Sequence, residues 1–587
     1  MRHPSRIRFA VLLVLLLAPS LLAQSDDDPL SHRQRDAREK AVRDYGGTRK
    51  TERAVADGLA WLAAHQQPDG VWNRTGFPRQ CPAGDHCSQA AVAFESRDAD
   101  VGLTALATLA FLGAGYTHEE GPYAQHLSRA FSYILAQQNT TGGFTDAVGY
   151  QMYCDAISTI AIAECYALTK DEVLRRPLER AIAHVAQAQQ PEGGWDYTDA
   201  RTHRNDTSIT GWCVMAIKSA QAAGVDVPLR TRLNLIRHFD RATEPDGRVW
   251  YADKRENPSA GGNRTLIRRR YGPAMTATGL FVRSTLGFRM DDRIATRQIE
   301  RLLADLPNLE KFRDANGDGL HSAYYWYYGS LALFHVGGEP WAQWNRALRN
   351  TILEYQERPT TPKGGRRHAY GSWPAFGRGW GKWGRTGGRV YSTAINTLTL
   401  EVYYRYLPAY LSPRGVIGPH EVRDLVDKAG PDDQLALVRL AARFHADIAE
   451  PILLDLLESP SAVVRIESAI ELADIGSPAG QALLVATEPT SPPDIRRRIQ
   501  NVLPHIRATP PETQYGEVTA VRAEAGMVLF ETGERRVYYG QRVRITRNDR
   551  LVGTAVINRR FTVQRAAAAQ VENTDVDIRR GDIVISD

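Results

Sequence analysis

Apolar residues recur in the first half of the chain at steps of three and four, the spacing that places them on one face of a helix. The same offsets precede three similar turns, with Val55, Leu59 and Leu62 before the first, Leu127, Phe131 and Ile134 before the second, and Leu178, Ile182 and Val185 before the third. Because the matching positions share one register, the segment is predicted to be a repeat of amphipathic helices.

The turns after these helices share a motif, written "QQPDGVW" at 66–72, "QQNTTGGF" at 137–144 and "QQPEGGW" at 189–195. Each has a glutamine, then glycine four residues later and an aromatic residue six residues later: Gln66, Gly70 and Trp72; Gln138, Gly142 and Phe144; Gln189, Gly193 and Trp195. Glycine lets the chain reverse, the aromatic ring is expected to cover a neighbouring helix end, and the amide to tie the turn with hydrogen bonds. We interpret this motif, called the clamp, as architecture.

Between the amphipathic helices lie segments 98–115, 155–168 and 206–223, which are apolar on nearly every side and are therefore predicted to be buried helices. Each begins with Asp, as expected of an N-cap. Weaker pairs follow, with 229–241 before 273–287, 295–305 before 322–336, and 341–357 before 391–407. Six helical hairpins predict a mainly α fold, an (α/α)6 toroid, because a closed ring buries the end faces that an open solenoid must cap.

Paired helices joined by Q-x-x-x-G-x-W/F turns resemble the α/α-toroid of squalene and oxidosqualene cyclases and of protein prenyltransferase β subunits. The resemblance covers 50–410. Within it, "NDTSITGW", "SAYYWYYGS", "WAQWN" and "GGRVYSTAINTLTLEVYYRYLP" are similar to a bacterial group described as prenyltransferase/squalene-oxidase repeat proteins. The resemblance implies the fold and leaves the activity open.

The N-termini of the inner helices are expected to gather around one mouth of the ring and to form a concave binding site there. The candidate catalytic residues are Asp98, Asp100, Asp155 and Asp206, and the candidate ligand-binding residues are Thr207, Trp212, Tyr324, Tyr325, Trp326 and Tyr391. For each acid, helix capping is the alternative interpretation.

The catalytic motifs of the resembling enzymes are incomplete in this sequence. Squalene-type cyclases use a D-x-D-D acid, and "DADV" at 98–101 lacks the last Asp. Prenyltransferases hold zinc with a D-x-C pair and a later His, whereas Cys154 and Asp155 are adjacent and reversed. Cyclisation is therefore not expected. An enzyme acting on a polysaccharide or isoprenoid remains the alternative to ligand binding, because glycosidases need only two carboxylates about 5–10 Å apart.

Two short segments bear on metals and disulfides. Cys81 and Cys87 of "CPAGDHC" are predicted to form a disulfide. A metal site is the alternative interpretation, but the spacing is not that of a zinc knuckle and no His-x-His completes it, so none is predicted. "DANGDG" begins like a calcium loop with Asp314, Asn316 and Asp318, but its twelfth position is Tyr325 where a Glu is required. An Asx-rich turn is preferred there, with weak calcium binding left open, and no other cofactor is predicted.

The N-terminus and the composition bear on location. Residues 1–23 combine a basic start with an apolar run too short to span a bilayer, which predicts a signal peptide and an exported protein, periplasmic or secreted. Residues 24–49 are expected to be a flexible leader. The net charge of +6 is spread along a chain with 24% charged residues and gives no reason to propose a nucleic-acid partner.

The last third changes in character. Residues 411–509 contain short helical pairs that resemble HEAT-type repeats, and 515–587 alternate like the strands of a small SH3- or OB-like barrel. Both resemble modules that bind partner proteins. Our leading interpretation is an exported toroid that binds a glycan or isoprenoid in its cavity, with C-terminal modules that bind an envelope protein.

Overall fold

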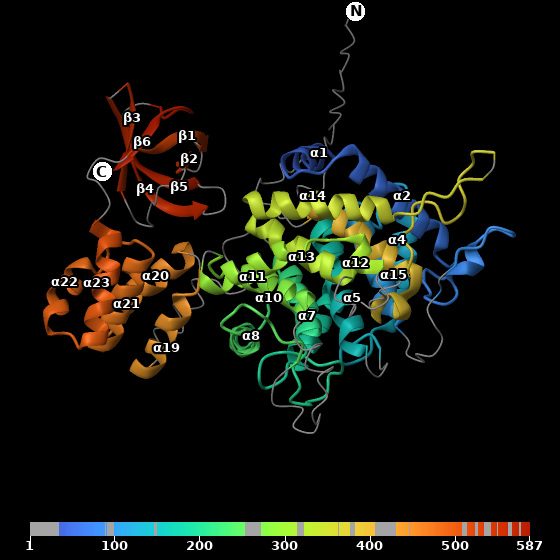
Figure 1. Cartoon of the computed structure of the whole chain (residues 1–587), viewed down its shortest axis with the longest axis horizontal. Coiled ribbons are helices and arrows are strands. Elements are labelled where there is room, and N and C mark those ends of the chain that lie inside the picture. The colour runs from blue at the N-terminus through green and yellow to red at the C-terminus, as the bar shows by residue number, and fades with distance from the viewer. Residues whose placement is uncertain are drawn as a thin grey trace, which may run out of the picture.

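The structure is a computed structural model of the chain, whose helical unit and C-terminal barrel are drawn in Figure 1. It describes residues 35–88, 90, 99–145, 150–252, 272–290, 292–313, 322–361, 363–375, 382–405, 430–444, 446–507, 514–522, 526–532, 542–548, 550–561, 566–574 and 577–586. The predicted signal peptide therefore lies outside the described residues.

Six buried helices pack side by side in a ring. They are α3 (Asp100–Gly113), α5 (Gln151–Thr169), α7 (Thr207–Ala222), α10 (Pro273–Thr285), α13 (Ala323–Val336) and α15 (Lys382–Leu400). Each packs against the next in this order, and α15 packs against α3. Within α3 every residue from Val101 to Gly113 is buried, which agrees with its all-round apolar sequence.

A second set of helices packs on the outside of this ring. It comprises α2 (Arg49–His65), α4 (Ala124–Gln137), α6 (Glu172–Gln187), α8 (Leu229–Ala242), α11 (Arg293–Ala304) and α14 (Gly338–Tyr355). Contacts join α4 to α3, α6 to α5 and α7, α11 to α10, α14 to α13, and α2 to α15. The predicted apolar stripe is the buried face: in α4 it consists of Leu127, Ala130, Phe131 and Ile134.

The starts of the inner helices differ in part from the prediction. Asp206 is the N-cap of α7 as expected, and its side chain accepts from the backbone N–H of Ser208 and Ile209. Helix α5 instead begins at Gln151, so that Asp155 lies inside the helix and does not cap it. Asp100 is the first residue of α3, after Ala99 at the N-cap.

The clamp glutamines tie their turns with hydrogen bonds, as the sequence predicted, and they also join neighbouring outer helices. In each clamp the amide Nε2 donates both to the carbonyl of the clamp glycine and to a carbonyl near the start of the next outer helix. The pairs of acceptors are Gly70 and His126 for Gln66, Gly142 and Pro177 for Gln138, and Gly193 and Thr231 for Gln189. The rings of Trp72 and Trp195 donate back to the preceding helix, at Leu62 O and Val185 O.

A further clamp, which the sequence analysis missed, joins the last hairpin to the first. Gln356 donates to Gly371 O at 2.8 Å and to Ala54 O of α2 at 2.9 Å. Trp373 takes the aromatic position, and its ring donates to Ile352 O. The motif was hidden because the stretch between Gln356 and Gly371 is longer than in the other clamps. We call this stretch, residues 357–370, the clamp insertion.

Replacement of Gln189 by Ala is expected to lower the free energy of unfolding by about 1–3 kcal/mol, because two backbone carbonyls lose their buried amide donor. The measurement is denaturant unfolding followed by helical circular dichroism. Gln187, the last residue of α6 and two positions before Gln189, is exposed, so Gln187→Ala is the matched control and should change stability little. Equal effects of the two substitutions would show that the clamp amide contributes nothing.

After the ring the chain forms a smaller helical unit and a barrel. The helices are α19 (Pro431–Ala441), α20 (Ala446–Leu456), α21 (Ala462–Asp474), α22 (Gln481–Thr487), η4 (Glu488–Thr490) and α23 (Pro493–Arg507). Successive helices pack on one another, and the likeness to HEAT repeats stays a prediction. The unit contacts the ring through Phe288 and Phe444, whose ring centroids are 5.4 Å apart, and through an ion pair between Arg289 and Asp474.

The predicted C-terminal barrel is present. Its strands are β1 (Gln514–Arg522), β2 (Met527–Glu531), β3 (Arg542–Arg547), β4 (Arg550–Phe561), β5 (Ala566–Thr574) and β6 (Ile583–Ser586). They close in the order β1-β2-β5-β4-β3-β6, and every pairing is antiparallel. Val518, Phe530 and Val543 are among the side chains that fill the interior.

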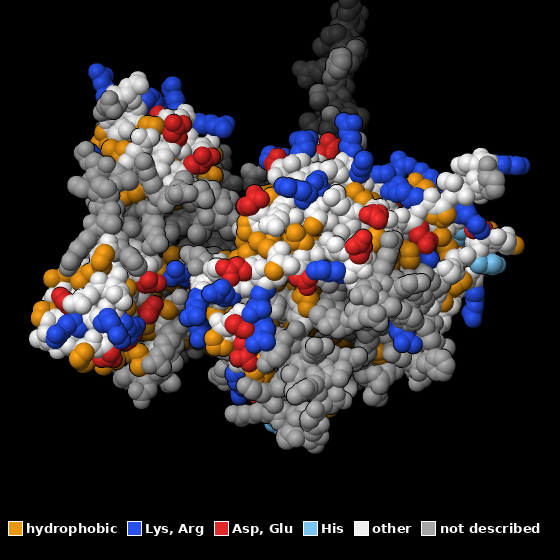
Figure 2. Space-filling view, viewed as in Figure 1, with side chains coloured by type: hydrophobic (Ala, Val, Ile, Leu, Met, Phe, Trp, Pro, Cys, Tyr) orange, Lys and Arg blue, Asp and Glu red, His pale blue; other side chains and the backbone are white. Residues whose placement is uncertain are grey.

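Short helices complete the described chain: α1 (Arg35–Asp44), η2 (Phe77–Gln80), α12 (Leu309–Arg313) and α16 (Val402–Arg405). Helix α1 corrects the expectation that 24–49 is wholly flexible, because it packs against α16 and Arg38 forms an ion pair with Glu52. Within the described part of the chain, no helix is both long and apolar enough to cross a bilayer. On the face drawn in Figure 2, acidic and basic side chains are interspersed.

Candidate functional site

A narrow cavity lies among the N-terminal halves of the inner helices. Its volume is about 60 Å³, and its wall includes Leu103 and Leu106 of α3, Tyr153 and Ile157 of α5, Trp212 of α7, Tyr324 of α13 and Tyr391 of α15. We call this cavity the axial slot. Helices far apart in sequence thus contribute to one space. Among the described residues that line it, apolar and aromatic side chains predominate, Arg74 is charged, and no Asp or Glu is present.

Two tyrosines of the slot wall, Tyr153 and Tyr324, engage their hydroxyl groups with the protein, whereas the buried hydroxyl of Tyr391 has no hydrogen-bond partner among the described residues. Tyr153 and Ser208 share a hydrogen bond of 2.6 Å between their hydroxyls. Tyr324 donates to Ser208 O at 3.1 Å. Burial raises the pKa of both phenols far above the usual range, so that neither is ionised at neutral pH. These side chains therefore present apolar ring faces to the slot.

The other candidate ligand-binding residues lie away from the slot. Thr207 is buried and donates through its hydroxyl to Trp250 O. Tyr325 donates to Asp305 O, in the segment that follows α11, at 2.7 Å. Trp326 is buried in the core and does not line the slot. Of the six predicted ligand-binding residues, the structure brings together Trp212, Tyr324 and Tyr391.

Asp100 holds the turn that follows α2. Its carboxylate accepts from the backbone N–H of Arg74 at 3.0 Å and from Asn73 Nδ2 at 2.5 Å. These bonds hold the backbone of the turn at Arg74, whose side chain lines the slot. The described contacts therefore give Asp100 a structural role, which is to hold the turn beside the axial slot.

Asp155 occupies a repeated structural position. In three clamps the backbone N–H of the aromatic residue donates to a threonine hydroxyl of the next inner helix: Trp72 to Thr104, Trp195 to Thr210, and Trp373 to Thr393. In the remaining clamp Phe144 N donates to Asp155 Oδ1 at 2.7 Å, so Asp155 stands where threonine stands elsewhere.

The second oxygen of Asp155 pairs with a histidine. Asp155 Oδ2 lies 3.0 Å from His184 Nε2, and both side chains are buried. Burial disfavours a charged imidazole, but the hydrogen bond and the charge of Asp155 outweigh it and raise the pKa of His184. The carboxylate is thereby directed toward the outer helix α6 and away from the slot.

Asp206 is fully buried and held by several donors. Besides capping α7, it accepts from the Ser208 hydroxyl and forms an ion pair of 2.9 Å with Arg204, which also binds Asp196. Burial raises the pKa of Asp206 despite these partners. A raised pKa is a feature of catalytic acids, but Asp206 does not line the slot. Asp98 lies outside the described residues, as do Asp314, Asn316 and Asp318 of the possible calcium loop.

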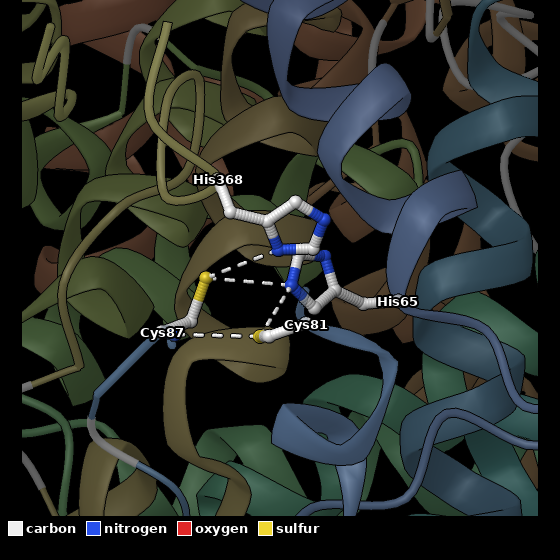
Figure 3. Close-up of side chains that lie close together, drawn as sticks. All are labelled: His65, Cys81, Cys87 and His368. Carbon is white, nitrogen blue, oxygen red and sulfur yellow. Dashed lines mark hydrogen bonds between the residues drawn. The ribbon is translucent and has the colours of Figure 1, made fainter. Parts of the chain in front are cut away.

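The two cysteines predicted to form a disulfide are both free thiols in the structure. His65 Nε2 lies 3.5 Å from Cys81 Sγ and 3.4 Å from Cys87 Sγ. Cys87 Sγ also lies 3.7 Å from His368 Nδ1 (Figure 3). We call these four residues the cysteine–histidine cluster. Sequence reasoning missed both histidines, because one ends α2 and the other lies in the clamp insertion.

The sequence matches neither a protein-family model nor a curated protein. Solved structures with a similar chain path include an α-1,6-mannanase, GH76A of Salegentibacter sp. HEL1_6, at 11% identity and a TM-score of 0.42, matching 62% of this chain and 100% of that one. They also include the type II terpene cyclase MstE from Scytonema, at 13% identity and a TM-score of 0.39, with 62% and 100% matched. Likeness this distant shows no shared activity.

Proposed function

We propose that the protein is an exported binding protein whose (α/α)6 toroid holds a slender apolar group, such as the end of a prenyl chain, in the axial slot. The observation that carries the proposal is the chemistry of the slot wall. Aromatic and aliphatic side chains line it, and the hydroxyls of Tyr153 and Tyr324 are hydrogen-bonded to protein partners. A wall of this kind recognises its ligand by burial of apolar surface and by shape.

The size of the slot favours a narrow ligand. A cavity of about 60 Å³ holds roughly four water-sized groups. This is close to the size of one isoprene unit, and each buried methylene stabilises the complex by about 0.8 kcal/mol. Arg74 at the wall supplies a cation that can contact a polar or anionic head group outside the apolar part. The slot thus suits a molecule with one branched apolar end and one polar end.

The carboxylates nominated from sequence support binding more than catalysis. Asp100, Asp155 and Asp206 each accept backbone hydrogen bonds, and the last two also pair with a cationic or titratable side chain. A typical glycoside hydrolase needs two carboxylates facing a shared cleft. An enzyme that uses these acids on a polysaccharide or isoprenoid is therefore the less supported alternative. The C-terminal helices and barrel are assigned in this proposal to binding a protein of the cell envelope.

Filling the slot is expected to weaken ligand binding at least about tenfold, the equivalent of 1.4 kcal/mol. Ile157 lines the slot, and Ile157→Phe adds a ring where the ligand would lie. The measurement is calorimetric titration of the purified protein with farnesol, with dodecanol as a straight-chain comparison and a mannose oligosaccharide as a glycan comparison. Farnesol should bind best to the unmodified protein.

The matched control is Val173→Phe, which adds the same ring on an exposed position of α6. Thermal unfolding of both variants establishes that each is folded before binding is compared. Unchanged farnesol affinity in Ile157→Phe would contradict the slot as the site. Binding of the oligosaccharide in place of farnesol would contradict the class of ligand and favour the alternative.

A further inference from the structure

The donor atoms of the cysteine–histidine cluster already lie at the separations of a metal site. The two sulfurs, His65 Nε2 and His368 Nδ1 all lie within 4.8 Å of one another. With Zn–S near 2.3 Å and Zn–N near 2.0 Å, tetrahedral coordination places a sulfur and a nitrogen ligand about 3.5 Å apart. The observed S···N distances of 3.5, 3.4 and 3.7 Å match that value. Figure 3 shows the four side chains converging on one point.

The groups around the cluster orient the ligand atoms. His65 Nδ1 lies 2.7 Å from Trp61 O, and since a carbonyl only accepts, Nδ1 carries the proton and Nε2 presents its lone pair to the sulfurs. Such a bond to the far nitrogen is typical of metal-binding histidines. The backbone N–H of Cys87 donates to Cys81 Sγ at 3.3 Å, an interaction that favours a thiolate.

Aromatic rings pack on the His65 side of the cluster, whereas Cys81 and His368 are half-buried. The ring of Trp61 stacks on His65 with centroids 3.9 Å apart, and Phe77 lies edge-on at 5.7 Å. Cys87 and His65 are buried. Two thiolates and two neutral imidazoles give a divalent ion a neutral centre, which suits a buried position. Four protein ligands also complete the tetrahedron, so that no position stays open for a substrate.

We propose that the cysteine–histidine cluster binds a structural zinc ion, and that this ion locks the seam where the last hairpin of the ring meets the first. Two thiolate and two imidazole ligands select zinc among the common divalent ions, since calcium and magnesium prefer oxygen. The proposal stands independently of the ligand assigned to the axial slot.

The position of the cluster indicates that its role is to join the first and last hairpins of the ring. His65 ends α2, and Cys81 and Cys87 belong to the connection between α2 and α3. His368 comes from the clamp insertion, which lies between α14 and α15. The same two segments are also tied by Asp85, which accepts from the backbone N–H of His368 at 2.8 Å and from Arg367 at 3.1 Å. The clamp insertion therefore carries His368, the residue that completes the ligand set.

The test is the zinc content of the purified full-length mature protein, measured by mass spectrometry of the metal after dialysis. We expect about one zinc ion per chain, and we expect Cys87→Ser and His368→Ala to lose it. The matched control is Cys165→Ser: Cys165 also contacts a histidine, at 3.2 Å from His118 Nδ1, but lies outside the cluster. This variant should keep its zinc.

A second measurement needs no substitution. Replacement of zinc by cobalt(II) in the unmodified protein should give the visible absorption of tetrahedral cobalt together with a sulfur-to-cobalt charge-transfer band. Removal of zinc by a chelator should lower the Tm of the unmodified protein and leave that of His368→Ala unchanged, because a bound metal stabilises only the state that binds it.

Three results would overturn the proposal. One is an unmodified protein that takes up neither zinc nor cobalt. Another is a zinc content that His368→Ala and Cys87→Ser do not change. The third is an intact mass two hydrogens lower than that of the reduced chain, with Cys81 and Cys87 found in one linked peptide, because a disulfide consumes both thiolates that the metal requires.

Discussion

Replacement of Arg405 by Met is expected to lower the free energy of unfolding by about 3–5 kcal/mol, because it leaves a buried carboxylate without its cation. Arg405 on α16 is fully buried and donates to Glu164 Oε1 of α5 at 2.8 Å and to Oε2 at 3.4 Å. The two side chains join the inner layer to the end of the last hairpin. The measurement is denaturant unfolding followed by helical circular dichroism.

The control for this prediction is the double variant Arg405→Met with Glu164→Leu. When both charges of a buried pair are replaced by apolar groups of similar size, the cost is often small or absent. We therefore expect the double variant to be markedly more stable than Arg405→Met alone. If the single and double variants lose the same stability, the loss comes from packing and the ion pair has no specific role.

Replacement of Gly193 by Ala is expected to destabilise the ring by about 3 kcal/mol, the sum of a steric clash and an unfavourable backbone conformation. Gly193 has φ of +101°, and a Cβ atom there would lie 2.0 Å from the carbonyl oxygen of Asn234 on α8. Neither backbone can move without separating the clamp from the next outer helix. Denaturant unfolding by circular dichroism measures the loss.

Gly224 provides a matched control for this substitution. Its φ is +84°, but nothing lies within 4 Å of a Cβ built there. Gly224→Ala therefore has the backbone cost alone, about 1 kcal/mol. The difference between the two variants isolates the close approach of the clamp to α8. Equal losses at both positions would contradict the clash as the cause.

The close approach explains why the clamp needs glycine and not merely a turn. Gly70, Gly142 and Gly371 also have positive φ, and a Cβ at each would lie 2.3 or 2.4 Å from a carbonyl oxygen of the next outer helix. At Gly371 that oxygen belongs to Asp57 of α2, so the same contact closes the ring. Sequence analysis gave the glycine a role in reversing the chain and did not foresee the contact between helices.

Asp155 shows why acidic residues near helix starts were hard to assign from sequence. An Asp after a polar turn fits an N-cap and a catalytic acid equally well, because both need an exposed carboxylate oxygen at a helix end. Only a comparison of the hydrogen bonds in the clamps shows that the Asp155 carboxylate takes the place of a threonine hydroxyl. The equivalence rests on hydrogen bonds between separate helices, which leave no periodic trace in the sequence.

The sequence by itself determined the local features of this protein. Apolar spacing determined the outer and inner helices, and the repeated glutamine, glycine and aromatic residues determined the clamps, because helix faces and turns depend on residues close together in the chain. Only the tertiary structure decided which distant residues share a space. Cys87 meets His368 across the seam, 281 positions apart, and Trp212 meets Tyr391 at the axial slot. Such contacts follow from how the ring closes, and no local pattern encodes the distance between residues brought together by closure.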